Sequence, residues 1–147
     1  MADPGAMDAL IQRLRKLHEK RPRAWGKMTP HEMICHLTDS FNVALGERPC
    51  ARKDTWVRRT FVRRIALHTS FAWPKGLPTM PEVDQGRDGT RPGEFAADVA
   101  RFIDIVQRFA APDSRYAAHP MMGPLTRDEW LIWGYRHIDH HLRQFAL

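Results

Sequence analysis

The spacing of apolar residues constrains the fold of this chain most strongly, because it repeats every three or four positions over several long stretches. The first stretch covers about residues 6–19 and has apolar residues at Met7, Leu10, Ile11, Leu14 and Leu17. Residues at this spacing lie on one face of an α-helix. No stretch shows a convincing alternation of apolar and polar residues, which a half-buried strand would require. The sequence therefore predicts an all-α protein.

Two capping boxes mark where helices begin. In TPHE, Thr29 is the N-cap and Glu32 reaches back to its backbone N–H, and in TRDE, Thr126 and Glu129 have the same roles. The first box predicts a helix that runs to about Gly46, and the second predicts a final helix. The inner face of the earlier helix is predicted to carry Met33, His36, Leu37, Ser40, Phe41 and Ala44.

Two further helices are predicted, over about residues 54–69 and 93–110. Between them, residues 74–93 are rich in proline and glycine. A connection of this length usually crosses over a domain or folds down as a lid. We therefore predict an up-down four-helix bundle with a crossover connection and a long loop at residues 74–93.

A chain of 147 residues fits one domain, which we assign to residues 1–147 with residues 1–6 disordered. No apolar run approaches the roughly 20 residues that span a bilayer, and the N-terminus lacks the pattern of a signal peptide. The two cysteines, Cys35 and Cys50, are too few for a disulfide framework. We expect a cytoplasmic protein that does not enter the membrane.

The formal net charge of +6 raises nucleic acid as a partner, because clustered Lys and Arg attract phosphate. The densest basic run lies in the helix predicted over residues 54–69. One side of its helical wheel carries Arg58, Arg59 and Arg63, and the other side carries Val57, Phe61 and Ile65. This is the pattern of an ordinary helix whose basic side faces solvent. Because no zinc-finger spacing, aromatic strand motif or helix-turn-helix pattern accompanies it, we expect no specific nucleic-acid binding.

Three histidines fall within five residues of the final helix, in the segment GYRHIDHHLRQF. His137 and His141 are one turn apart and only about 40° apart around the helix axis, so their side chains leave the same face. His140 points about 100° away from His141. Two imidazoles on one helix face have the geometry of a chelating pair, and a metal site then needs a third ligand from elsewhere.

His36 is the candidate for that ligand, because it lies in the middle of an apolar helix face where an unpaired imidazole is costly to bury. Asp39, three residues later, is predicted to orient or neutralise a neighbour of the site. Three neutral imidazoles would hold a divalent metal ion, either zinc, nickel or iron, and leave a position open for water or substrate.

Other interpretations of these histidines stay open. His36 also fits a hydrogen-bonded core residue, and paired histidines one turn apart are often structural. His31 and Cys35 are also one turn apart, as in a nucleophile with its base, but His31 is predicted to lie in an exposed first turn and nothing marks Cys35 as activated. His18 and His68 are typical of helix ends.

The segments MTPHEMICHLTDSF and HPMMGPLTRDEWLIWGYRHIDHHLRQF resemble the DinB-like superfamily, within it a bacterial group of uncharacterised domains with a terminal H-x-x-H-H-L-R-Q-F helix. The resemblance implies a four-helix bundle that holds a metal with one histidine on the second helix and two on the last. The three metal-binding histidines of the family correspond to His36, His137 and His141 in this sequence. Gln144 matches the family glutamine, a second-shell or packing residue, and His119 matches a loop histidine at the pocket mouth or serving as a loop anchor.

Met122 stands where this group often has an aromatic residue, so the pocket is expected to differ in shape from that of the group. Some relatives are transferases or isomerases whose metal activates a low-molecular-weight thiol. The resemblance thus implies a metal-dependent enzyme acting on a small-molecule substrate, by thiol transfer or by metal-assisted hydrolysis. An acidic group of such a thiol would bind Lys75, Arg136 or Arg143, unless these are plain surface charges.

The alternative function belongs to a different functional class: a non-catalytic helical bundle that acts as a dimer or partner-binding module. In that case the histidines are core hydrogen-bonding groups or hold a structural metal. Trp130, Trp133 and Tyr135 give the final helix more aromatic surface than one core face needs, which suggests a homodimer contact. The same side chains would also fit inside the core.

Overall fold

The computed structural model describes residues 4–147, and within these residues the secondary structure is helical. The elements are α1 (Pro4–Leu14), α2 (Pro30–Ala44), the π-helical turn η1 (Arg58–Val62) continuing into α3 (Arg63–His68), the 3-10 turn η2 (Pro81–Val83), α4 (Phe95–Ala110) and α5 (Arg127–Gln144). The described part of the chain contains no strand, only an isolated bridge between His119 and Gly123. The predicted all-α class is confirmed.

The N-terminal segment differs from its prediction at both ends. Disorder was predicted for residues 1–6, yet residues 4–6 already belong to α1, while residues 1–3 lie outside the described residues. The same helix ends at Leu14, five residues before the predicted end. A tighter turn follows, in which the Leu17 N–H donates to the Leu14 carbonyl, and Leu17 still reaches the core. Leu10, Leu14 and Leu17 of the predicted apolar face are buried, whereas Met7 and Ile11 are only partly buried, and the predicted helix was too long.

Both predicted capping boxes are present. Thr29 Oγ1 accepts from the Glu32 N–H at 3.2 Å, and Glu32 Oε2 accepts from the Thr29 N–H at 2.8 Å. At α5, Thr126 and Glu129 repeat this exchange. Because a capping box involves residues only three positions apart, a short stretch of sequence is enough to place the start of each helix.

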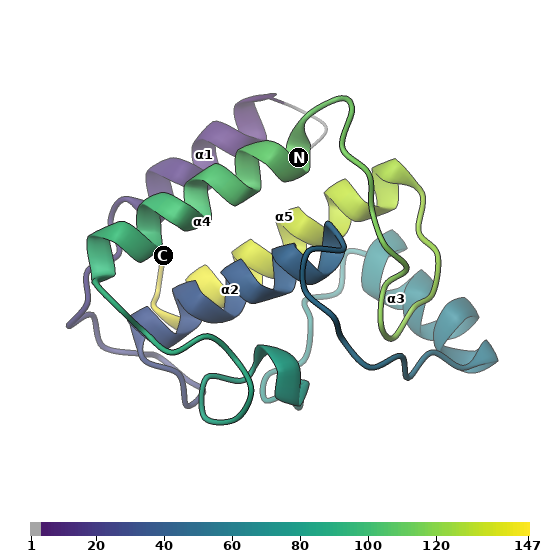
Figure 1. The fold of residues 1–147 in the computed structure, drawn as a ribbon, viewed down its shortest axis with the longest axis horizontal. Coiled ribbons are helices and arrows are strands. Elements are labelled where there is room, and N and C mark those ends of the chain that lie inside the picture. Colours follow the sequence, from purple (N-terminus) through teal and green to yellow (C-terminus); the bar gives the residue numbers. More distant parts are fainter. Residues whose placement is uncertain (1–3) are drawn as a thin grey trace.

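The four longer helices α1, α2, α4 and α5 lie alongside one another (Figure 1). α2 packs against both α4 and α5, and α1 packs against α5. This arrangement agrees with the all-α prediction, and its assignment to a DinB-like bundle stays a prediction. No helix within residues 4–147 has both the length and the apolar character needed to cross a bilayer.

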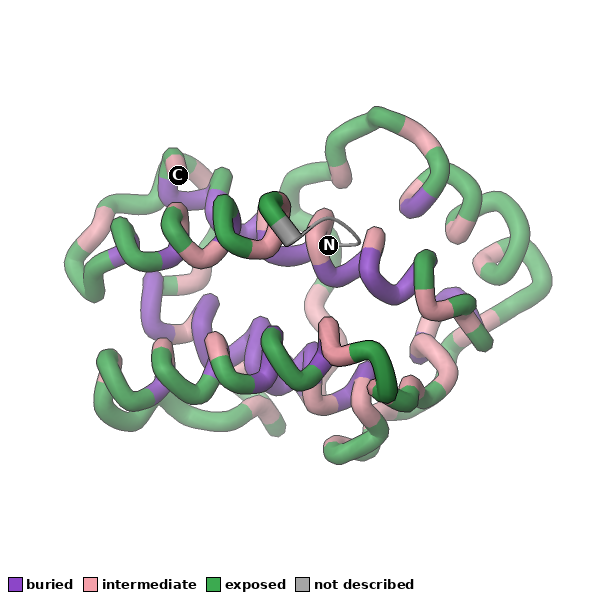
Figure 2. Tube along the Cα trace, turned by 90° about the horizontal axis from the view of Figure 1, so that it is seen from above, coloured by how far each residue is buried: buried purple, intermediate pink, exposed green. Residues whose placement is uncertain are grey.

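α2 is the central helix, and it is buried on more sides than its sequence pattern indicated (Figure 2). The predicted inner face is buried, and so are Ile34, Cys35, Thr38 and Asp39, which were not assigned to it. The reason is that α4 covers a second side of the helix and the loop containing η2 covers a third. α5 contributes Trp130 and Trp133 to the same core, so these two side chains are packed inside and do not form the surface suggested for a homodimer contact.

The segment that contains α3 corrects the prediction made from its helical wheel. Its apolar side faces solvent, with Phe61 59% and Ile65 57% exposed, whereas the Arg63 side chain on the basic side is only 28% exposed. Arg63 pairs with Glu129 of α5, and Arg59 pairs with Asp54 at 2.6 Å. The Glu129 carboxylate is largely buried and needs a cationic partner, so its pair with Arg63 draws the helix toward α5, whereas Asp54 belongs to the same segment as Arg59.

Candidate metal centre

Three histidines from two helices meet between α2 and α5. His36 comes from the middle of α2, and His137 and His141 come from one face of α5, as their spacing predicted. Their candidate ligand atoms all lie within 4.8 Å of one another, and the Nε2 atoms of His36 and His137 are 3.3 Å apart. All three side chains are buried. The described structure therefore brings together the residues that the sequence nominated as metal ligands.

Hydrogen bonds fix the tautomers of two of these rings. The Nδ1–H of His36 donates to the carbonyl oxygen of Val83 at 2.7 Å, and the Nδ1–H of His141 donates to Oε1 of Gln144 at 2.8 Å. A carbonyl oxygen only accepts, so each ring carries its proton on Nδ1 and has an unprotonated Nε2. Such outer contacts are typical of histidines that bind a metal through the other nitrogen.

His137 completes the set and has an unsatisfied polar atom. Its Nδ1 is buried and has no hydrogen-bond partner, while its Nε2 faces Nε2 of His36. Without an ion, the only proton available for hydrogen bonding to the Nε2 lone pairs of His36 and His141 would be one on Nε2 of His137. A divalent cation accepts several neutral imidazole lone pairs at once, so this donor set fits zinc, nickel or ferrous iron.

The electrostatics of the site keep the rings neutral. Burial lowers the pKa of His36, and it lowers the pKa values of His137 and His141 well below the ordinary range for histidine. The neighbouring imidazoles lower the pKa values of His137 and His141 further. Because only the neutral imidazole has a free lone pair, the three rings are in the form that binds a metal at neutral pH.

The chain between α1 and α2 supports Gln144, which orients His141. The N–H of Ala24 donates to the Gln144 carbonyl at 2.6 Å. Gly26 has φ +86°, and a Cβ at this position would lie 2.9 Å from Nε2 of Gln144. Glycine therefore lets the backbone approach closely and adopt a conformation that other residues rarely reach. Gln144 therefore lies between this backbone and the His141 ring, to which its Oε1 is hydrogen-bonded.

Asp39 lies near the site but contacts none of the three histidines directly. Its carboxylate accepts from the N–H and the hydroxyl of Thr90, both at 2.7 Å, and from Gln85 and Arg48, both at 3.1 Å. These contacts hold the loop of residues 80–90, which supplies the Val83 carbonyl to His36. Asp39 was predicted to orient or neutralise a neighbour of the site, and its contacts act on His36 through this loop.

His119 serves as a loop anchor, which was one of its two predicted roles. Its Nδ1 accepts from the N–H groups of Met121 and Met122 at 3.1 Å, and its ring packs against Trp130 and Trp133. Trp133 in turn contacts His137. His119 therefore shapes the wall behind the histidine cluster.

Protonation of His119 is expected to destabilise the fold. Burial lowers its pKa from 6.5 to about 4, so between these pH values the unfolded chain binds a proton that the folded chain does not. The free energy of unfolding should then fall as the pH drops through this window, by up to about 3 kcal/mol from this residue. His119→Asn keeps an acceptor but removes the titration, and urea unfolding from pH 4.5 to 7 should show a shallower pH dependence than in the parent. The exposed His18→Asn variant is the control, and parallel curves for all three proteins would contradict the prediction.

A second group of side chains that could ligate a metal joins α2 to α4. His31, Cys35 and Asp98 have ligand atoms within 4.8 Å of one another, and all three residues are buried. The prediction that His31 is exposed was wrong, because α4 covers the first turn of α2 and Nε2 of His31 lies 2.8 Å from Asp98. Burial, together with the charge of Asp98, raises the pKa of Cys35 to about 12, which argues against a cysteine nucleophile. Asp98 had no recognisable signal in the sequence.

The surroundings of the three histidines are aromatic and basic. The ring of Trp73 lies 5.8 Å from His137 and 6.0 Å from His140, and Trp25 also contacts His140. The three proposed anchors for an acidic group have partners within the chain: Lys75 lies over Trp25, Arg136 donates to the carbonyls of Thr69 and Phe71, and Arg143 pairs with Asp139. An apolar cavity between α1, α4 and α5 and a groove along residues 19–30 are both lined by other residues than the histidines.

A family model described as a protein of unknown function, DUF1569, matches residues 3–147. The search of curated proteins and the search of solved structures each found no match.

Proposed function

The chain belongs to the DUF1569 family of proteins of unknown function, and from that premise we propose that it binds a divalent metal through His36, His137 and His141 and acts on a small molecule. The observation that carries this proposal is the convergence of the three rings. Two of them are held with an unprotonated Nε2 directed into the cluster, and Nε2 of the third, His137, lies 3.3 Å from Nε2 of His36. The resemblance of the two motif segments to the DinB-like superfamily points to the same three residues.

The reaction that we propose first is thiol transfer. Metal-assisted hydrolysis is the alternative reaction. A divalent ion in such a site supplies Lewis acidity, which lowers the pKa of a thiol or water that it binds. The chain itself contributes three neutral imidazole ligands. It also contributes the acceptors that orient two of these rings, the Val83 carbonyl and Oε1 of Gln144. Aromatic rings around the cluster exclude water. Burial and nearby carboxylates raise the pKa values of Cys35 and Cys50, so the reactive thiol would come from a small molecule.

A non-catalytic module is the second candidate, and one observation favours it. Both the apolar cavity and the groove along residues 19–30 lie away from the histidines. In this alternative, Nε2 of His137 donates to Nε2 of His36 at 3.3 Å and the cluster is a hydrogen-bonded part of the core. Without a metal-dependent activity, the cluster would then contribute only to stability.

Elemental analysis of the protein without a histidine tag tests the metal site. We expect about one divalent metal per chain in the parent, and its loss in His36→Ala and in His137→Ala, because two imidazoles alone bind weakly. His140→Ala is the matched control: this residue lies on the same helix but outside the group of three histidines, and its metal content should equal that of the parent. Circular dichroism would check that each variant is folded.

No metal in the parent after incubation with zinc, nickel or ferrous iron would contradict the site and favour the structural module. If the metal is present, the loaded protein should catalyse attack of a small thiol on an electrophilic carbon compound that carries a halide leaving group. Activity in the parent and in His140→Ala, but not in His36→Ala, would support thiol transfer. Binding of metal without this activity would leave hydrolysis as the next reaction to assay.

A further inference from the structure

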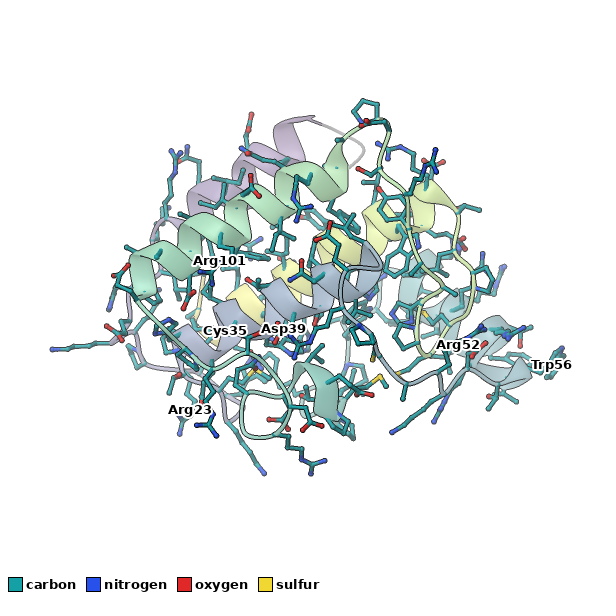
Figure 3. The ribbon with its side chains drawn as sticks, viewed as in Figure 1. Arg23, Cys35, Asp39, Arg52, Trp56 and Arg101 are labelled. Atoms are coloured by element: carbon teal, nitrogen blue, oxygen red, sulfur yellow. The ribbon has the colours of Figure 1, made fainter. Side chains whose placement is uncertain are left out.

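The segment around α3 carries an apolar face that nothing in the described chain covers. This face, which we call the α3 ridge, consists of Trp56, Val57, Phe61, Val62 and Ile65. Trp56 is 70% exposed, and its ring meets that of Phe61 edge to face at 5.9 Å. Figures 1 and 3 show this helix at one end of the molecule, with Trp56 at its outermost edge.

The helix attaches to the protein through its opposite side. Leu67 is buried in the core, Arg63 pairs with Glu129, and the side chain of Arg59 lies against Gly123. An amphipathic helix usually buries its apolar side and exposes its basic side. Here the apolar side is exposed, and the helix attaches to the protein through its basic side. An exposed, contiguous apolar surface of this kind marks an interaction site.

We propose that the α3 ridge is the interface of a homodimer, in which the ridges of two copies of this chain pack against each other. The area is sufficient. An aromatic side chain buries about 150–250 Å² when fully covered, so two aromatic and three aliphatic side chains at these exposures offer on the order of 500 Å². Two facing ridges would then bury about 1,000 Å² in total, which meets the minimum of about 1,000 Å² for a biological interface.

The charges around the ridge favour a second copy over an anionic membrane surface. A helix that lies on a membrane presents free Lys and Arg beside its apolar face. Here Arg52 and Arg59 share Asp54, Arg63 pairs with Glu129, and Arg58 donates to the Lys53 carbonyl. Among the described residues of this segment, Lys53, Arg58 and Arg64 make no ion pair, and Arg58 is bound to the Lys53 carbonyl.

The test is sedimentation velocity of the full chain over a range of concentrations. We expect a dimer that Phe61→Ser or Ile65→Ser weakens at least about tenfold, because interface aromatic and aliphatic anchors carry most of the binding energy. Both residues are exposed in the single chain, so the variants should fold normally by circular dichroism. Leu77→Ser is the matched control: Leu77 has a similar exposure, 54%, but lies outside the ridge and should leave the dimer unchanged.

Two further measurements identify the occupant of the ridge. Phe61→Cys should form a disulfide-linked dimer on oxidation, while Arg23→Cys, at the opposite end of the molecule in Figure 3, should not. Added salt should strengthen a dimer by screening Lys53 and Arg64, whereas it would weaken binding to vesicles of anionic lipid. A chain that stays monomeric, a dimer insensitive to Phe61→Ser and Ile65→Ser, or binding of the monomer to anionic vesicles through Phe61 would each overturn the proposal.

Discussion

Replacing Asp39 with alanine is expected to weaken metal binding by about 10- to 100-fold, the range typical of outer-shell contacts, although Asp39 touches none of the proposed ligands. Its carboxylate is the common acceptor for Thr90, Gln85 and Arg48. Without it, the loop of residues 80–90 would lose the contacts that present the Val83 carbonyl to His36. The ring of His36 could then rotate, and its Nε2 would no longer be held toward the cluster.

The same substitution should also destabilise the protein. Arg48 joins Asp39 to three points of the loop, donating to Asp39, to the Glu82 and Asp88 carbonyls and to the Thr90 hydroxyl. Removing a buried carboxylate leaves these donors partly unpaired, which costs about 3–5 kcal/mol in comparable buried ion pairs. Urea unfolding would measure this loss, and hydrogen exchange should show faster exchange in residues 80–90.

Asp88→Ala is the matched control for Asp39→Ala. Asp88 lies in the same loop and is exposed, and its contact with Arg48 uses its backbone carbonyl, which the substitution keeps. Its metal affinity, measured by competition with a chromophoric chelator, should equal that of the parent. If Asp39→Ala speeds exchange in the loop but leaves metal affinity unchanged, then the loop does not orient His36.

Replacing Glu129 with alanine is the second change with a large expected effect. Glu129 caps α5 through the Thr126 N–H and also accepts from Arg63 and His68, so one side chain starts α5 and attaches α3. We expect the free energy of unfolding to fall by about 2–4 kcal/mol, somewhat below the cost for a fully buried pair because Arg63 can regain water. The measurement is urea unfolding at pH 7, with Asp128→Ala, an exposed first-turn neighbour, as the control.

The pH dependence of this contribution has a definite sign. Burial alone would raise the pKa of Glu129, but the bonds from Arg63, Thr126 and His68 bring it down to about 2. The folded protein therefore holds the carboxylate ionised where the unfolded chain is protonated. The stabilisation is complete above about pH 4.5 and is lost as the pH falls toward 2. A Glu129→Ala variant whose stability difference from the parent stays constant between pH 6 and pH 3 would contradict this account.

The helix starts and the metal-ligand candidates were predictable because they depend on local spacing. Thr29 and Thr126 cap helices through residues three positions away, and His137 and His141 share a face because a helix turns every 3.6 residues. His36 was found by its place on an apolar face. The local rules failed at His31, where Asp98, 67 positions away, turns an expected surface residue into a buried one.

What the sequence by itself determined is the all-α class, the starts of α2 and α5, and the set of histidines on their inner faces, because helix periodicity and capping act over one or two turns. Only the tertiary structure decided that Asp39 holds a loop against His36 and that the α3 ridge faces outward. Both depend on partners distant in sequence: Thr90 and Val83 in one case, and Glu129 in the other. A helical wheel shows which side of a helix is apolar, but the buried carboxylate of Glu129 in α5 decided which side of this helix turns toward the protein.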